Sequence, residues 1–399
     1  MNDAEIAVDR EKRSRPWGRQ VLAALLKSTG ARIGLAWVGV LVLVATFAPF
    51  IASSHPLLLV VDGQTSSPVM AYLTPVDWIW LIGFVAVLLF FMLPGRLWLR
   101  MLALLMTLGV TTVLAYTLVS PPALIIYEEY RELEQAGAVE RVLRAPIPFS
   151  AKDYLRDMGD TGVEAPLQAE DRRHWLGTED NGADVAARMI HASRIALAIG
   201  FIATGIALSI GTIIGGLMGY FSGVVDIIGM RLVEIFEAIP TLFLLLTFVA
   251  FFGRSIYMMM IIIGITSWSA YARYVRAEFL KLREQDFVQA AVACGLPLPS
   301  ILFRHMLPNG LAPLLVAASF GVASAILAEA TLSFLGLGLV DDPSWGQMLN
   351  QAVQSSTFNW WLAVFPGGAI FLTVFSYNLI GEALRDAVDP HTRRTEGTS

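Results

Sequence analysis

The sequence predicts an all-α polytopic membrane protein with about eight transmembrane helices. Of its 399 residues, 56% are hydrophobic and only 15% are charged, and the mean hydropathy is +0.62. Soluble globular chains of this length are far less apolar. A hydrocarbon core about 30 Å thick is crossed by roughly 20 apolar residues in a helix, and several runs reach or approach that length. Lipid is therefore the solvent for much of the chain.

Eight apolar runs are candidate spans. They cover residues 33–52, 78–93, 97–119, 195–220, 236–252, 256–270, 311–335 and 361–380. Only Pro94, Gly95 and Arg96 separate the second run from the third, so these two runs can only form a tight helical hairpin. We divide the chain into an N-terminal region (1–32), a first membrane region with one span and this extra hairpin (33–119), a loop (120–191), a five-helix membrane core (192–385) and a tail (386–399).

Basic residues predict the orientation, because Lys and Arg near membrane spans are retained on the cytoplasmic side. Seven of them precede the first span: Arg10, Lys12, Arg13, Arg15, Arg19, Lys27 and Arg32. Arg96 and Arg100 flank the hairpin turn, which we also place inside, whereas the acidic loop 120–191 is placed outside. With eight spans, both termini are cytoplasmic. The first apolar run is too long for a cleaved signal peptide, so we expect an uncleaved helix.

The external loop has two parts of different composition. Charged and apolar residues alternate over 127–144, which predicts a surface amphipathic helix. The Pro- and Gly-containing run over 146–166 is either a solvated spacer or a segment ordered against the membrane domain or a soluble partner. Asp184 is placed to cap a helix that begins near Val185, and substrate contact is the alternative.

Small residues mark one helix of the core. Gly211, Gly215, Gly219 and Gly223 recur every four residues, which predicts a helix face that another helix approaches closely. Channels, secondary transporters and membrane enzymes share this packing signal. The single cysteine, Cys294, excludes an internal disulfide and is interpreted as a packing residue. The scattered His174, His191 and His305 predict no metal site, and no nucleic-acid footprint is present.

The most informative segment is 273–310, a polar stretch between two spans that we place in the cytoplasm. Its residues match the pattern E-A-A, three residues, G, nine residues, I-x-L-P, with Gln289, Ala290, Ala291, Gly295, His305, Leu307 and Pro308 at the corresponding positions and Arg304 adjoining. Gln289 and His305 depart from the Glu and Ile of that pattern. The two alanines keep a helix slim enough to enter a groove, and Gly295 permits a sharp exit from it.

This segment resembles the coupling loop of permease subunits of binding-protein-dependent ABC importers, in particular the dipeptide/oligopeptide family. The resemblance covers roughly residues 172–391, together with the basic N-terminal region and the first span, and includes the segments 174–185, 328–338, 343–346 and 384–390. Within 174–185, Glu179 and Ala183 stand where the family has Asp and Arg. The extra hairpin is not part of the family pattern. The alternative to a coupling loop is that 273–310 is an amphipathic connector on the membrane surface, whose basic residues contact anionic lipid.

The resemblance implies a bacterial inner-membrane importer made from several chains. It implies two ATPase subunits that bind ATP and Mg²⁺, a second homologous permease and a periplasmic solute-binding protein, with membrane lipid around the spans. The chain has no phosphate-binding loop, so no cofactor is expected on it and no catalysis either. The substrate stays open among dipeptides, longer peptides, peptide antibiotics, opines and nickel chelates.

Two functional alternatives belong to other classes. An ATP-independent secondary transporter or channel would carry charges at mid-membrane in several spans, or inverted repeats, and neither is evident. A membrane-embedded enzyme would need convergent nucleophile and base residues, which the motifs do not supply. Glu329, near the end of an apolar run, is either a residue of the transport pathway or gate, or a group paired at the interface.

Overall fold

The computed structural model describes residues 17–95, 97–122, 125–155, 163–167, 174–339, 342–355 and 357–388. They form two compact units. The first unit consists of the described residues within 1–39, 196–339 and 368–399, and the second of those within 40–195 and 340–367. Some residues used to predict the orientation lie outside the described residues: Arg10, Lys12, Arg13, Arg15 and Arg96. Most of the tail also lies outside them.

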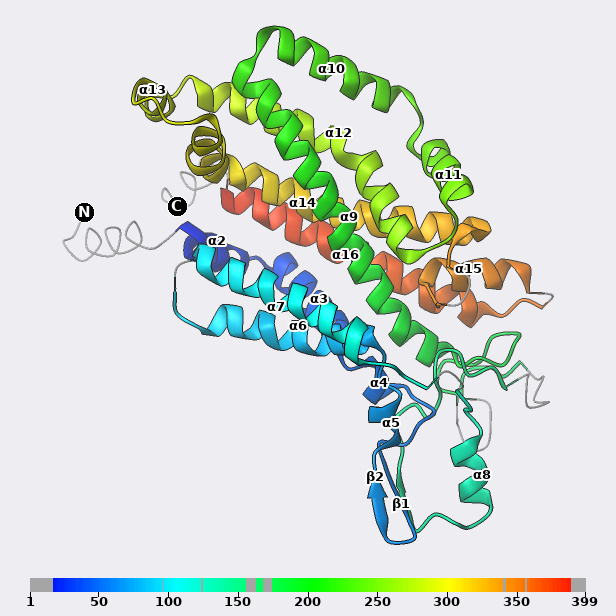
Figure 1. Cartoon of the computed structure of the whole chain (residues 1–399). Helices are drawn as coiled ribbons and strands as arrows, with labels where there is room; N and C mark the ends of the chain where they lie inside the picture. The colour runs from blue at the N-terminus through cyan, green and yellow to red at the C-terminus, as the bar shows by residue number, and fades with distance from the viewer. Residues whose placement is uncertain are drawn as a thin grey trace, which may run out of the picture. The chain divides into compact units, whose positions relative to one another are not determined.

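The first unit is helical throughout (Figure 1). Its elements are α2 (Trp17–Leu25), α10 (Gly223–Ala238), α11 (Thr241–Phe252), α12 (Ile256–Arg283), α13 (Asp286–Ala293), η2 (Ser300–Met306), α14 (Leu307–Leu332) and η3 (Ser333–Leu337). Helices α3 (Thr29–Thr46), α9 (Val185–Phe221) and α16 (Trp360–Val388) have residues in both units.

Glycines let α9 and α12 approach each other closely. A Cβ at Gly211, Gly215 or Gly219 would lie within 2.6 Å of a backbone or Cβ atom of α12, the shortest contact being 2.4 Å from Gly215 to the Ala272 carbonyl oxygen. No other residue fits without separating the helices. Gly223 is different, because nothing lies within 4 Å of its Cβ position and its φ is +56°. It serves the turn into α10 and does not belong to the packing face.

The expected span over 236–252 is not one continuous helix. Two helices, α10 and α11, meet there at a bend of 82°. The cause is local: Pro240 has no N–H to continue the helix, and the residue before a proline avoids helical angles. Ile239 accordingly adopts the extended conformation, with φ −90° and ψ 121°.

The expected number of eight spans is not confirmed. By length and composition, six of the described helices are able to cross a membrane, or seven if α10 and α11 together form one broken span. Helix α12 is outside this count. Its first half is apolar, but its second half carries Arg273, Arg276, Lys281 and Arg283.

Arg276 pairs with Asp226 of α10 at 2.6 Å, while Arg231 pairs with Glu234.

The second unit contains a small antiparallel sheet that the sequence did not suggest. Strands β1 (Leu58–Val61) and β2 (Gln64–Ser66) are joined by the two-residue turn Asp62-Gly63, and β3 (Arg141–Leu143) pairs with the other edge of β1. Both turn residues have positive φ, which is the conformation that an Asp-Gly hairpin favours. The remaining helices are α4 (Ala48–Ile51), α5 (Pro68–Ala71), α6 (Pro75–Met92), α7 (Leu97–Leu118), α8 (Glu129–Gln135) and α15 (Trp345–Gln354).

The predicted amphipathic helix over 127–144 is wrong in extent. Only α8 forms, because Gly137 adopts a φ of +71° just after it and the chain then extends into β3. The following run is not a solvated spacer in its described part. Ile147, Phe149 and Leu155 are buried in a cluster with Ala186 and Ala187 of α9. The prolines therefore shape a packed segment, while Gly159 and Gly162 lie outside the described residues.

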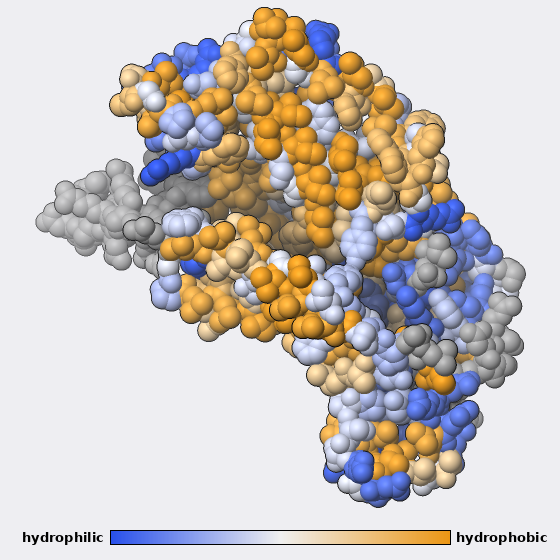
Figure 2. Space-filling model, in the orientation of Figure 1, coloured by the Kyte–Doolittle hydropathy of each residue, from blue (hydrophilic) through white to orange (hydrophobic). Residues whose placement is uncertain are grey.

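The extra hairpin forms as α6 and α7, and a buried ion pair holds its start. Thr74 and Asp77 make a capping box at the N-terminus of α6. Arg194 of α9 pairs with Asp77 and donates to the Ala45 carbonyl oxygen of α3 at 2.5 Å. Apart from this anchor and Arg100, the hairpin is mainly apolar, and Figure 2 shows apolar side chains gathered over α7. One guanidinium thus joins α3, α6 and α9.

A second buried ion pair lies before and within α9. Asp184 accepts from the Ala187 N–H at 2.7 Å and so caps the helix as predicted, and its other oxygen lies 2.8 Å from His174 Nδ1. Arg188 Nε lies 2.7 Å from Glu179, with both side chains 2% exposed. Burial raises the pKa of Glu179 to about 7, against the lowering effect of Arg188. Position 183 holds Ala where the family has Arg, and Arg188 is the residue that pairs with Glu179.

Candidate coupling site

The segment 273–310 folds as a short helix held between two long ones. Helix α12 ends at Arg283, α13 follows after two residues, and a turn leads through η2 into α14. Pro308 is the second residue of α14, which continues directly from η2. The sequence motif therefore covers α13 and the entry into α14.

The inner face of α13 rests on a buried apolar cluster. Val288 and Ala291 are 0% and 6% exposed and pack with residues of α12, η2 and α14. The other buried members are Val275, Phe279, Leu282, Ile301, Leu302, Met306 and Leu314. Because α13 has only eight residues, it would be a marginal helix in water by itself. The cluster therefore fixes α13 as a rigid part of the first unit.

The outer face of α13 is exposed and largely apolar. Ala290 is exposed, and so are the larger Phe287 (40%), Val292 (45%) and Leu296 (37%). Gln289 uses its side-chain amide to donate to the Arg283 carbonyl oxygen at 2.8 Å, which caps the end of α12. An apolar face on a short helix whose other face is buried is a surface suited to a protein partner.

Gly295 ends α13 in a Schellman motif. The Leu296 N–H donates to the Ala291 carbonyl oxygen at 3.2 Å, and the Gly295 N–H donates to that of Val292 at 2.9 Å. This pattern places Gly295 at the left-handed position, and its φ is +69°. Nothing lies within 4 Å of its Cβ position. Conformation, and not lack of space, is what requires glycine here.

The charges around α13 remain near the surface. Lys281 pairs with Glu278 and Arg283 with Glu284. Arg304 of η2 is exposed and has no ion-pair partner among the described residues. His305 is half-buried, its carbonyl oxygen accepts from the Asn309 amide at 2.6 Å, and Leu307 packs against the buried cluster.

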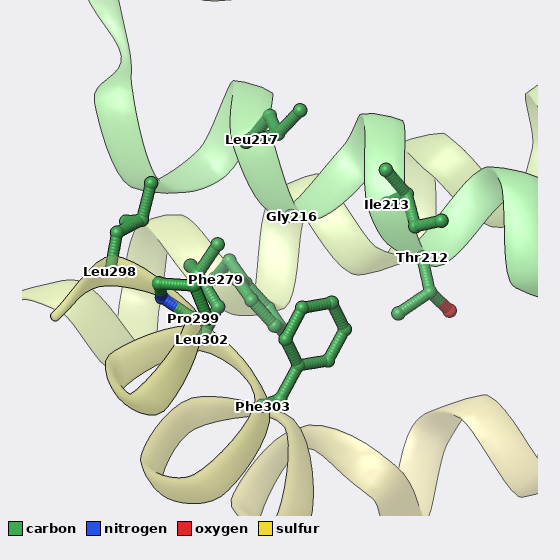
Figure 3. Close-up of a pocket in the computed structure, with 9 residues that line it drawn as sticks. All are labelled: Thr212, Ile213, Gly216, Leu217, Phe279, Leu298, Pro299, Leu302 and Phe303. Carbon is green, nitrogen blue, oxygen red and sulfur yellow. The ribbon is translucent and has the colours of Figure 1, made fainter.

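An apolar cavity of about 180 Å³ lies beside the segment, between α9 and η2 (Figure 3). It is lined by Thr212, Ile213, Gly216, Leu217, Phe279, Leu298, Pro299, Leu302 and Phe303. Gly216 of α9 thus leaves space beside η2. Helix η2 is a π-helix, a type often found at functional positions.

The remaining candidate residues lie elsewhere. Glu329 is 2% exposed, and its carboxylate accepts from the Ser333 hydroxyl at 2.6 Å. It lies near the far end of α14 from Pro308, about 30 Å away along the helix axis. His174 and His191 belong to the second unit and His305 to the first. Within the described ranges, no group of three His, Cys, Asp or Glu side chains is able to hold a metal ion.

Sequence reasoning missed one feature of the site and one ion-pair residue in the second unit. It did not single out the outward-facing Phe287, Val292 and Leu296, although their spacing around Ala290 and Ala291 carried that signal. It also missed Arg188, whose position one turn into α9 placed it within reach of Glu179.

Sequence matches assign this helical multi-pass chain to the membrane-embedded subunits of transport systems. The chain belongs to the family described as binding-protein-dependent transport system inner membrane component, whose model matches residues 190–394. The N-terminal TM domain of oligopeptide transport permease C matches residues 15–75. The hairpin α6–α7, α8 and β3 lie between these two matches.

Relatives agree with this assignment. The chain is 39% identical to the dipeptide transport system permease protein DppC of Alkalihalophilus pseudofirmus over 58% of this chain and 76% of that protein. It is also 39% identical to the oligopeptide transport system permease protein OppC of Haemophilus influenzae, over 62% and 78%. A solved structure of the MetNI methionine ABC transporter in an inward-facing conformation shares 18% identity and a TM-score of 0.40, over 49% of this chain and 96% of that one. The family assignment rests on the sequence matches.

Proposed function

We propose that this permease subunit imports peptides in an ATP-driven complex and that α13 is the helix through which ATPase subunits act on it. The observation that carries the proposal is the two-sided character of α13. Its inner face is fixed to α12, η2 and α14, while its outer face presents exposed apolar side chains. A force applied to α13 therefore acts on both long helices.

Peptides are the proposed substrate class because the relatives at 39% identity are named for dipeptide and oligopeptide transport. The proposed partners are two ATPase subunits carrying ATP and Mg²⁺, a second homologous permease and a periplasmic solute-binding protein. Both termini are proposed to lie in the cytoplasm, on the same side as α13. ATP-driven closure of the ATPases would alternate the access of the transport pathway, a rigid-body change between two states.

Co-purification from mild-detergent membranes tests the docking role. The tagged wild-type chain is compared with Gly295→Asp, and recovered proteins are identified by mass spectrometry. Gly137→Asp is the matched control, because Gly137 also has positive φ (+71°) and open space around its Cβ position. We expect an ATPase with the wild type and with Gly137→Asp, and its loss with Gly295→Asp.

Recovery of the ATPase with all three chains would contradict docking through α13. Its absence from every sample would contradict the importer assignment and favour an ATP-independent transporter. The substrate class is tested separately by uptake of labelled di- and oligopeptides into cells with and without the gene. Uptake that is unchanged by deletion would remove peptides from the proposal.

A further inference from the structure

The Tyr271 side chain of α12 reaches into the space beside Gly321 of α14. The Cβ atom of any other residue at position 321 would occupy that space. A Cβ at Gly321 would lie 1.6 Å from the Tyr271 hydroxyl oxygen and 3.0 Å from Tyr271 Cζ. Since real Cβ atoms do not approach other heavy atoms below about 3 Å, the hydroxyl stands where the side chain of α14 would begin. Tyr271 is 6% exposed, so it is buried among the helices.

The base of the same side chain is fixed on a third helix. A Cβ at Gly211 of α9 would lie 2.5 Å from the Tyr271 Cβ. Thr204 of α9 also reaches the Gly321 notch, with its methyl carbon 3.2 Å from the Gly321 Cβ position. Tyr271 is therefore held at its base by α9 and at its tip by α14, and its length sets the spacing of three helices.

Two of these helices, α12 and α14, adjoin the coupling segment. Helix α12 enters it and α14 leaves it, so a displacement of α13 reaches the membrane through both. Two helices joined by a rigid side chain seated in a notch cannot slide past each other unless the side chain leaves the notch. Tightly packed interfaces of this kind have discrete arrangements and do not deform continuously.

We propose that Tyr271 is a positioning residue that makes α12 and α14 move as one body when the coupling segment is displaced. This inference rests on the proposed function, because the displacement is the one that ATPase subunits would impose. It assigns a role in energy coupling to a contact inside the membrane domain, away from the motif that marks the coupling segment.

A size-exchange experiment tests the contact. Gly321→Ala adds a methyl group where the hydroxyl lies, Tyr271→Phe removes the hydroxyl, and the double variant combines both. Gly205→Ala on α9 is the control, because nothing lies within 4 Å of its Cβ position. Each chain is purified with its partners and reconstituted. Solute transported per ATP hydrolysed is the readout, and the thermal midpoint of the complex is recorded in parallel.

We expect Gly321→Ala to lower transport per ATP by about tenfold, the scale that overpacking of one contact imposes on an equilibrium. Tyr271→Phe should lower it less. The double variant should recover towards Tyr271→Phe, because Cζ lies 3.0 Å from the new Cβ and only a small shift is needed. Gly205→Ala should match the wild type.

Two results would overturn the proposal. In the first, Gly321→Ala lowers transport, ATP hydrolysis and thermal midpoint in proportion, which is the behaviour of a merely structural contact. In the second, the double variant transports no better per ATP than Gly321→Ala. A wild-type complex without ATP-driven uptake would instead refute the proposed function, and the role of Tyr271 with it.

Discussion

Two charged regions of this chain are built in opposite ways. In the second unit, Glu179 pairs with Arg188 and Asp77 with Arg194, and no member of either pair is more than 9% exposed by its side chain. In the first unit, the ion pairs beside α13 are exposed, with Lys281 at 71% and Glu284 at 66%.

The contrast indicates different mechanical roles. A buried ion pair that loses one partner leaves an uncompensated charge, so such pairs hold elements in one arrangement. Exposed pairs contribute little and exchange partners readily. The segment around 174–194 is therefore a fixed scaffold, whereas the surface around α13 remains available to another protein. Four changes test this difference between the two regions, and they follow in order of decreasing effect on stability.

Arg188→Met should cause the largest loss of stability. It leaves the Glu179 carboxylate buried without its cation, which costs about 3 to 5 kcal/mol. Unfolding of the detergent-solubilised chain is measured at pH 8, where Glu179 of the wild type, with a pKa of about 7, is mainly ionised. Adding Glu179→Gln to the variant should restore much of the loss. A single variant as stable as the wild type would show that this pair is not a fixed element.

Gly215→Ala should be the next most damaging change. The new Cβ would lie 2.4 Å from the Ala272 carbonyl oxygen, a backbone atom that cannot turn aside. Overpacking of this kind costs about 1 to 3 kcal/mol. Gly205→Ala on the same helix meets no atom within 4 Å and should be neutral or slightly stabilising. Equal thermal midpoints for the two variants would contradict close packing of α9 on α12.

Acidification should destabilise the second unit around His55. Burial lowers the pKa of His55 to about 4, and the ring stacks on Tyr72 with centroids 3.8 Å apart. The unfolded chain therefore binds the proton at higher pH than the folded one, so this part of the stability is complete above about pH 6.5 and is lost as the pH falls towards 4. Thermal midpoints across this window should fall more for the wild type than for His55→Gln. Parallel curves would show that His55 is not buried in its neutral form.

Arg231→Ala should have the smallest effect. Arg231 and Glu234 are 72% and 43% exposed, and such a surface pair contributes less than about 1 kcal/mol. The same unfolding measurement should barely distinguish this variant from the wild type, in contrast to Arg188→Met. A loss similar to that of Arg188→Met would remove the distinction between the two regions.

The sequence predicted what depends on local pattern. Apolar runs located most of the long helices but not all of their ends, since α9 begins at Val185 and α12 continues to Arg283. Asp184 caps α9 as its position indicated. The pattern around Gly295 located the candidate site, since the turn it requires is encoded within a few neighbours.

Features that depend on distant partners were not predictable. Strand β3 pairs with β1 about 80 residues earlier, and neither strand is long enough to give a clear alternation. The bend at Pro240 was hidden because the apolar run continues on both sides of it. Tyr271 gave no signal either, because its role depends on the facing Gly321, and a tyrosine in an apolar helix is an ordinary core residue.

The central claim is that the surface around α13 receives an ATPase subunit, and the chain carries a natural probe for it. Cys294 is its only cysteine, lies beside Gly295 and is exposed. Membranes are labelled with a thiol-reactive photo-crosslinker and illuminated, and the partner joined to Cys294 is identified by mass spectrometry, with Cys294→Ser as the control. We expect an ATPase subunit to be crosslinked to the wild type and not to Cys294→Ser. Crosslinks only to lipid, or to proteins without a nucleotide-binding domain, would contradict it.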